Sequence, residues 1–220
     1  MIFSKRSLNI IILIVLCCAT CMAALPADTL TARKVFAEAP LEVLDMLRPS
    51  ARLDMLDYYT EADSIFNATD ALGGQSRLEQ IADDYMKVSV TPVSTLEIKI
   101  LPYKKSLMAM TIYTVGGDGI AKDSEIRFFD ENLRLMASDR LIKYPDVKAF
   151  FNLKDSNISD KELRNLIPFE AIEYTTGPGD APLTAIFTTL SALSEETRER
   201  LQPLLTPSIS AIWTGTNFKF

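Results

Sequence analysis

Histidine is absent from the 220-residue sequence, and its three cysteines, Cys17, Cys18 and Cys21, all lie near its start. A chain cleaved after them has no disulfide, no cysteine nucleophile and no Ser-His-Asp triad. It also has no zinc site built from cysteine and histidine. We therefore expect neither a cofactor nor a metal ion, and we expect stability to come from packing alone.

Positive charge is also scarce. The chain has 23 Lys and Arg against 29 Asp and Glu, and removal of Lys5 and Arg6 with a leader leaves 21 against 29, a net charge of −8. Nucleic-acid binding needs a basic surface, and no cluster of Lys or Arg occurs in the sequence. The composition therefore argues against a nucleic-acid partner.

Residues 1–23 have the features of a secretory signal peptide. Lys5 and Arg6 precede an apolar run from Ile10 to Ala19, which is shorter than the roughly 20 residues that span a bilayer. No second run follows, so we expect no transmembrane span after signal removal. The pattern predicts cleavage near Ala23 and export to the periplasm or the outer membrane. A lipid anchor at Cys21 is the alternative, although the residues before it fit a lipoprotein site poorly.

The stretch from Tyr85 to Asp130 alternates between apolar and polar residues, which is typical of half-buried strands. The alternation predicts that Glu97 and Lys99 face outward. Ser106 to Val115 is apolar on both faces, so we expect it to be the central strand. Helical spacing predicts helices over Pro40 to Leu47 and about Ser50 to Ala62, with Leu53 and Leu56 facing inward.

These patterns predict an α+β fold, an antiparallel sheet meander preceded by helices with a smaller C-terminal α+β half. We expect an exposed lead-in over residues 24–31, helices plus sheet over 32–142, and a second half packed on the first over 143–220. Ser159 and Ser194 are the expected N-caps of two helices in that second half. A single curved sheet wrapped on the helices, as in cystatins, is the alternative.

Three segments carry a resemblance to a known family. Arg52 to Tyr59, Lys99 to Pro102 and Asp123 to Asp130, in this order, resemble an uncharacterised exported family of Bacteroidales, domain of unknown function 3256. The resemblance covers roughly Thr31 to Ile142. It implies a compartment and a source, but no activity, because none is assigned to the family.

Two short motifs resemble the Asp-Ser/Thr-aliphatic sites that Bacteroidales glycosylate in exported proteins. They are Asp28-Thr29-Leu30 and Asp63-Ser64-Ile65. Thr29 is the better candidate because it lies in the exposed lead-in, whereas strand pairing could occupy Ser64. An ordinary capping or turn role is the alternative for both residues.

The missing chemistry favours a non-catalytic module that binds an envelope protein or a glycan through a sheet face or an edge strand. The alternative is a carboxylate-based, glycosidase-like hydrolase of the envelope, because glycosidases need only two acids. Its candidate acids are Asp54, Asp57, Asp83 and Asp84, which a solvated surface explains equally well.

Two further features suggest ligands but have simpler explanations. An apolar-ligand carrier would use Met108, Met110, Phe128 and Phe129, although such a stripe at strand spacing is normally core. The glycine-rich segment over residues 116–119 lacks the lysine and hydroxyl of a phosphate-binding loop, so we interpret it as a hairpin connection. We assign no catalytic, cofactor-binding or metal residue.

Overall fold

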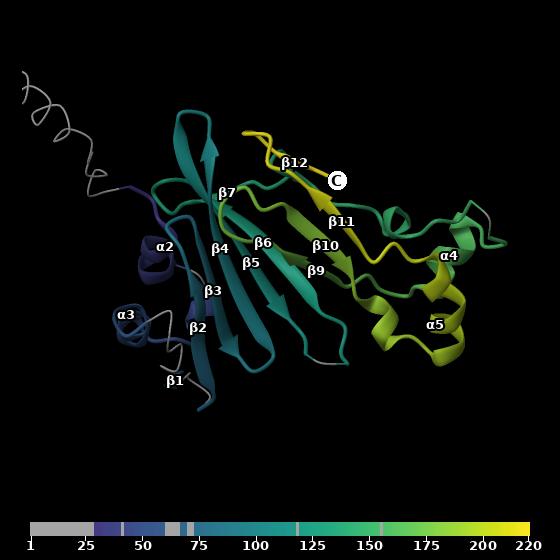
Figure 1. Ribbon diagram of the computed structural model, residues 1–220, viewed down its shortest axis with the longest axis horizontal. Helices are drawn as coiled ribbons and strands as arrows, with labels where there is room; N and C mark the ends of the chain where they lie inside the picture. The colour runs from purple at the N-terminus through teal and green to yellow at the C-terminus, as the bar shows by residue number, and fades with distance from the viewer. Residues whose placement is uncertain (1–28, 41, 60–66, 70–72, 118, 155) are drawn as a thin grey trace, which may run out of the picture.

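The computed structural model describes residues 29–220 except 41, 60–66, 70–72, 118 and 155. The expected signal peptide, Cys21 and Ser64 lie outside the described residues. The described chain forms three layers, with N-terminal helices on one face of a large sheet and the C-terminal half against the other face (Figure 1). This arrangement is an α+β fold, as the sequence predicts.

The main sheet has seven antiparallel strands that are neighbours in the order of the sequence. Two helices precede it, α2 (Ala32–Glu38) and α3 (Pro49–Asp57), with a short 3-10 helix at Glu42–Leu44 between them. The strands are β1 (Asn67–Thr69), β2 (Gln75–Ile81), β3 (Tyr85–Thr91), β4 (Ser94–Tyr103), β5 (Ser106–Val115), β6 (Asp123–Phe129) and β7 (Leu135–Met136). The predicted meander is therefore confirmed, but β4, and not β5, is the middle strand.

The C-terminal half adds two small sheets. β9 (Ile172–Thr175), β10 (Leu183–Phe187) and β11 (Ser208–Ala211) form one in the order β11-β10-β9, and β8 (Ile142–Lys143) pairs in parallel with β12 (Phe218–Lys219). The helices are α4 (Asp160–Leu166) and α5 (Glu195–Leu201), with 3-10 helices at Val147–Phe150, Thr189–Ala192 and Gln202–Leu204. Ser159 and Ser194 cap α4 and α5 as predicted, because each side-chain oxygen accepts a hydrogen bond from the backbone three residues on.

Two expectations about the N-terminal helices are wrong. The helix expected over Pro40 to Leu47 is, among the described residues, only the 3-10 helix at Glu42–Leu44. Pro49 disfavours the helical conformation at Arg48, whose φ and ψ are −55° and 146°, so this segment does not continue into α3. In α3, Leu53 is 52% exposed and Met55 is buried. A rotation of about 200° around the helix separates these two residues, so only one of them can face the sheet.

The helices cover their face of the sheet through apolar contacts. Val35 and Phe36 of α2 are fully buried, and they belong to one cluster with Met55 and the inward side chains of β3 and β4, namely Met86, Val88, Val90, Leu96 and Ile98. Burial of such side chains contributes about 1.5–3 kcal/mol each. The helices are therefore held mainly by an apolar core.

The opposite face of the sheet contributes to a second core. Met108, Met110 and Phe128 are fully buried and pack with residues of the C-terminal half such as Phe150, Leu183 and Phe187. Phe129 points to the other face and packs under the helices. The stripe that suggested an apolar-ligand carrier is thus split between two filled cores.

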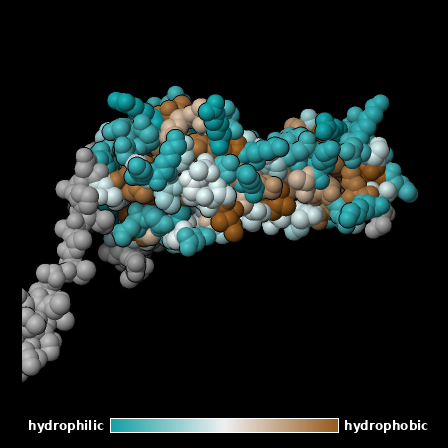
Figure 2. All heavy atoms as spheres, turned by 90° about the horizontal axis from the view of Figure 1, so that it is seen from above, coloured by the Kyte–Doolittle hydropathy of each residue, from teal (hydrophilic) through white to brown (hydrophobic). Residues whose placement is uncertain are grey.

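The described molecule is elongated, and the view from above shows apolar residues (brown) scattered among polar ones (teal) on that side (Figure 2). Within the described ranges, no helix has the length and apolar character needed to cross a membrane.

Candidate functional site

Glu97 and Lys99 do not face outward, as their alternation predicts. Each is only 4% exposed, because the C-terminal half covers the face of β4 that carries both side chains. The covering residues lie nearly eighty positions further along the chain, so the local pattern gives no sign of them. These two charged side chains are therefore the first candidates for a functional role.

The carboxylate of Glu97 accepts two hydrogen bonds through one oxygen. The Tyr85 hydroxyl donates at 3.0 Å and the backbone amide of Thr176 donates at 2.9 Å to Oε2. Burial raises the pKa of Glu97, and the two hydrogen bonds oppose part of this rise. Burial and the neighbouring Glu97 also raise the pKa of Tyr85.

The ammonium group of Lys99 uses all three of its donors. Nζ donates to Asp84 Oδ2 at 2.6 Å, to the Gly177 carbonyl at 2.9 Å and to the Gly179 carbonyl at 2.5 Å. The Gly179 amide donates back to the same oxygen of Asp84 at 3.0 Å. Lys99 thus fixes the β9–β10 turn to the main sheet, and it has no donor left for a ligand.

Three alternate amides of the chain through β9 are paired with side chains of the main sheet. Ile172 donates to Asp123 Oδ1 at 3.2 Å, Tyr174 donates to Ser124 Oγ at 2.9 Å, and Thr176 donates to Glu97. Side chains therefore take the place of a strand along this edge. The Glu97 and Lys99 network thus connects the two halves. A raised carboxyl pKa indicates catalysis only where substrate can reach the group, so we interpret this network as structural.

The four acids proposed for a hydrolase have different surroundings. Asp54 and Asp57 are exposed on α3, Asp83 is exposed in the β2–β3 turn, and Asp84 is bound to Lys99. Across the described ranges, no three acidic side chains lie close enough together to hold a metal ion. Glycoside hydrolysis requires a pair of carboxylates around a shared cleft, and none of the four acids lines any of the hollows described below.

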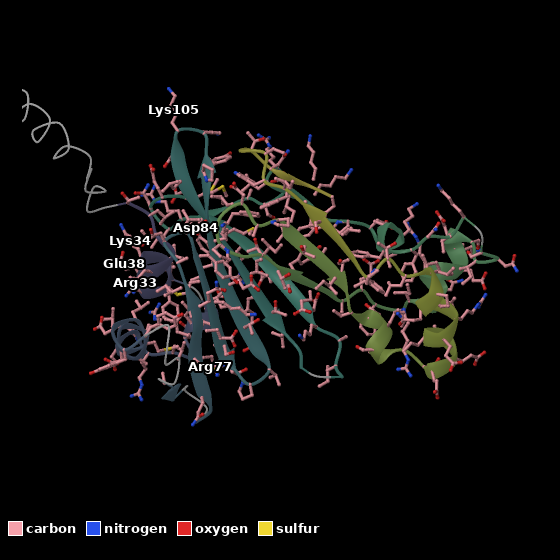
Figure 3. The ribbon with its side chains drawn as sticks, in the orientation of Figure 1. Arg33, Lys34, Glu38, Arg77, Asp84 and Lys105 are labelled. Atoms are coloured by element: carbon pink, nitrogen blue, oxygen red, sulfur yellow. The ribbon has the colours of Figure 1, made fainter. Side chains whose placement is uncertain are left out.

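Thr29, the described glycosylation candidate, is half-buried and borders a hollow of about 760 Å³. Lys34 and Glu38 of α2 and Lys105 also line this hollow. Figure 3 shows Lys105 at the tip of the β4–β5 hairpin, at the end of the sheet opposite Arg77. The hollow mixes both signs of charge, so it favours no single class of ligand.

A second hollow, of about 420 Å³, lies beside β6. Tyr144 and Tyr174 form one wall, with ring centroids 5.8 Å apart in an edge-to-face arrangement, and Asp123, Glu125 and Glu170 supply carboxylates. Asp123 already accepts the Ile172 amide, and Glu125 pairs with Arg127 at 2.9 Å. Two of the three carboxylates are thus engaged in structural contacts.

The other end of the main sheet carries an exposed aliphatic patch. Val93 in the β3–β4 turn and Ile120 in the β5–β6 connection are 51% and 64% exposed. Val115, 49% exposed, ends β5 on the helical side of the sheet, because it alternates with Tyr113, which packs with the helical cluster. The Gly116 amide donates to the Val93 carbonyl at 2.9 Å, which ties the two segments together. A side chain at Gly116 would meet the backbone of Ala121 and Lys122 at 2.7 Å, so only glycine permits this close approach.

A groove of about 520 Å³ runs beside this patch. Its polar lining comprises the hydroxyls of Ser89, Thr91, Ser94 and Thr95, the amide of Gln75 and two cations, Arg77 and Lys122. Lys122 also borders a neighbouring hollow of about 340 Å³ that contains Ile120. We call the aliphatic patch and this groove together the sheet corner.

The sheet corner was missed in the sequence because no single segment carries it. Val93 and Ile120 occur in turns, where an isolated apolar residue is unremarkable, and Ser89 and Thr95 read as the polar side of strands. Both β3 and β5 pair in antiparallel fashion with β4, so the C-terminal ends of β3 and β5 lie at the same end of the sheet. The interpretation of residues 116–119 as a connection agrees with the structure, since this segment joins β5 to β6.

Comparisons with known proteins support the fold and the family. A solved structure of a domain of an uncharacterized protein from Porphyromonas gingivalis W83 superposes with a TM-score of 0.72 at 17% identity, covering 85% of this chain and 96% of that one. At this identity the likeness concerns the fold alone. No curated protein matches the sequence. The family model named Protein of unknown function (DUF3256) matches residues 24–218, well beyond the segment that carries the resemblance, and the chain therefore belongs to this family.

Proposed function

We propose that the mature chain is an exported, non-catalytic interaction module that binds a polypeptide of the cell envelope at the sheet corner. The observation that carries this proposal is the pair of exposed aliphatic side chains, Val93 and Ile120, beside a groove that holds two cations. Export is part of the proposal and rests on the signal-peptide features of residues 1–23.

The chemistry of the sheet corner favours a polypeptide over a glycan. Sugars are usually held against aromatic rings, and neither the patch nor the groove contains an aromatic side chain. Clustered exposed aliphatic residues bordered by polar groups are typical of protein interaction sites. The hydroxyls of Ser89, Thr91 and Ser94 are hydrogen-bonded within the protein. Arg77 and Lys122 pair with Glu79 and Glu173 in partly exposed ion pairs, which an acidic segment can join.

The position of the perturbed carboxyl group supports the proposed non-catalytic role. Glu97 has a raised pKa, as a general acid would, but it is sealed between the two halves and lines none of the four hollows described above. The hydrolase alternative lacks a comparable group in an open cleft among the described residues.

The test is a cross-linked capture from envelopes of the native organism, followed by binding of the purified partner. The test variant is the double substitution Val93→Ser and Ile120→Ser, and the matched control is Leu53→Ser, which removes an equally exposed aliphatic residue on α3. We expect the purified partner to bind wild type and the control, and to bind the double variant at least tenfold more weakly, which corresponds to about 1.4 kcal/mol.

Equal loss of binding in the control and the double variant would remove the sheet corner from the proposal. Binding of glycans in the absence of any protein partner would contradict the proposed ligand class. Retention of full binding by the double variant would place the interface elsewhere.

A further inference from the structure

The hollow of about 420 Å³ beside β6 is built from three segments that lie far apart in the sequence. β6 supplies Asp123 and Glu125, Tyr144 follows β8, and the chain through β9 supplies Glu170 and Tyr174. β6 and β9 lie side by side here (Figure 1), joined by the hydrogen bonds from the β9 amides. Glu125, Tyr144 and Glu170 are exposed, so the hollow opens to solvent between the two halves of the molecule.

Tyr174 points an unpartnered hydroxyl into this hollow. The residue is only 3% exposed, yet its hydroxyl makes no hydrogen bond with any described residue, whereas buried tyrosine hydroxyls usually have a partner. Arg52 Nε is the only sealed side-chain polar atom without a partner in the described part of the chain, so the Tyr174 hydroxyl reaches the open space that it borders. Burial raises the pKa of Tyr174, and Tyr144, Asp123 and Glu170 add to the rise, which places the hydroxyl near the carboxylates of the hollow.

The charge around the hollow has one sign. None of the described residues that line it is Lys or Arg. Glu125 pairs with Arg127, but Asp123 and Glu170 form no ion pair with any described residue, and Glu170 also makes no hydrogen bond there. Two uncompensated carboxylates at one hollow repel each other, and a cation between them relieves this repulsion. The hollow therefore favours a positively charged ligand.

We propose that this hollow binds an organic cation, the guanidinium or ammonium group of a side chain or of a small amine. The Tyr174 hydroxyl and the carboxylates of Asp123 and Glu170 accept its N–H groups, and the ring of Tyr144, which is 45% exposed, covers it through a cation–π contact. A neutral sugar would use the rings but leave the carboxylates uncompensated. The inference does not depend on the proposed function, because the hollow and the groove of the sheet corner share no lining residue.

Titration of a chain that begins at Ala24 with N-acetyl-arginine amide, followed by NMR, tests the proposal. We expect saturable shifts of the backbone amide signals of Ile172 and Tyr174, which border the hollow. N-acetyl-citrulline amide is the matched probe, because it has nearly the same shape without the charge, and it should bind about tenfold more weakly. N-acetyl-lysine amide and the diamine putrescine distinguish the sources. Binding of the two amides alone indicates a side chain of a polypeptide, and equal binding of putrescine indicates a small amine.

Two variants locate the site. Glu170→Gln removes an uncompensated carboxylate and Tyr144→Leu removes the exposed ring, and each should weaken binding of N-acetyl-arginine amide about threefold or more. Glu199→Gln is the matched control, because it removes one exposed acid of α5 that lines none of the hollows described above, and it should bind like the wild type. The proposal is overturned if no cation shifts these signals, if citrulline binds as tightly as arginine, or if Glu170→Gln and Glu199→Gln behave alike. Shifts of the same signals by glucose in place of the cations would also overturn it.

Discussion

The two faces of the main sheet are covered in different ways. The helical face is held by an apolar cluster around Phe36, and hydrogen bonds on that side join the helices to each other or to the β2–β3 turn. Glu42 also pairs with Arg127 of β6 at 3.6 Å, but its side chain is 81% exposed. The C-terminal face has an apolar cluster of its own, but it adds Glu97 and Lys99, both buried and both bonded across the interface. Apolar packing is non-directional, whereas charged hydrogen bonds require one position of the covering chain. The charged hydrogen bonds on the C-terminal face therefore fix the position of the covering chain, which the apolar packing on the helical face does not.

The largest expected effect comes from an apolar truncation, and it should be similar on the two faces. Phe36→Ala on the helical side and Phe150→Ala on the C-terminal side each remove a fully buried ring. Such truncations typically lower the free energy of unfolding by about 3–5 kcal/mol. Urea unfolding of both variants measures the two losses. A loss of less than about 1 kcal/mol for one variant alone would show that its face is not held by packing.

Lys99→Met should be the most damaging polar change, and the helical face offers no equivalent of it. The substitution keeps much of the side-chain volume but leaves the carbonyls of Gly177 and Gly179 and the carboxylate of Asp84 without their donor. We expect a loss of about 2–3 kcal/mol, below the range for fully buried ion pairs because Asp84 is partly exposed.

The readouts for Lys99→Met are the free energy of unfolding and amide exchange in the turn over residues 176–180, which should exchange faster. Lys105→Met is the control, because Lys105 lies at an exposed hairpin tip and should change neither measurement. Unchanged exchange in the turn would mean that the two halves are held by packing alone.

Much of the fold follows from local patterns in the sequence. The alternation from Tyr85 onward predicts the antiparallel meander, and Ser159 and Ser194 predict their helix starts, because strand period and N-caps are local properties. The burial of Glu97 and Lys99 could not be predicted in this way. Their partners, Thr176, Gly177 and Gly179, lie nearly eighty residues away, and a polar residue on a strand face reads as solvated whether or not another layer covers it. The sheet corner could not be predicted for the same reason, because its residues come together only through strand pairing.

Glu97→Gln should change how stability depends on pH. One oxygen of Glu97 accepts both hydrogen bonds, and a glutamine carbonyl can accept the same two, so the contacts survive while the charge is lost. The folded-state pKa of Glu97 is raised above its ordinary value of 4.5, so the folded protein retains a proton that the unfolded chain has lost. Wild-type stability should therefore fall relative to the variant as pH rises above 4.5, and level off above the raised pKa.

Urea unfolding of wild type and Glu97→Gln at a series of pH values measures this difference, since the other titrating groups contribute equally to both proteins. A difference that does not vary with pH, or one that grows in favour of the wild type as pH rises, would contradict the sealed environment of Glu97. Glu97→Ala is a useful companion, because it leaves Thr176 N–H and the Tyr85 hydroxyl without an acceptor and should cost about 1–3 kcal/mol.

The smallest expected effect on stability belongs to the sheet corner. Ile120→Ser removes a side chain that is 64% exposed, and surface substitutions of this kind usually change the free energy of unfolding by less than about 0.5 kcal/mol. Leu53→Ser should behave in the same way. The unfolding midpoints of both variants should therefore match the wild type. A marked loss for Ile120→Ser alone would mean that this residue supports the β5–β6 connection, and its exposure would then have a structural cause. An unchanged midpoint shows that folding does not need this side chain, which is the condition under which a loss of binding by the Val93→Ser and Ile120→Ser double variant can be assigned to the interface.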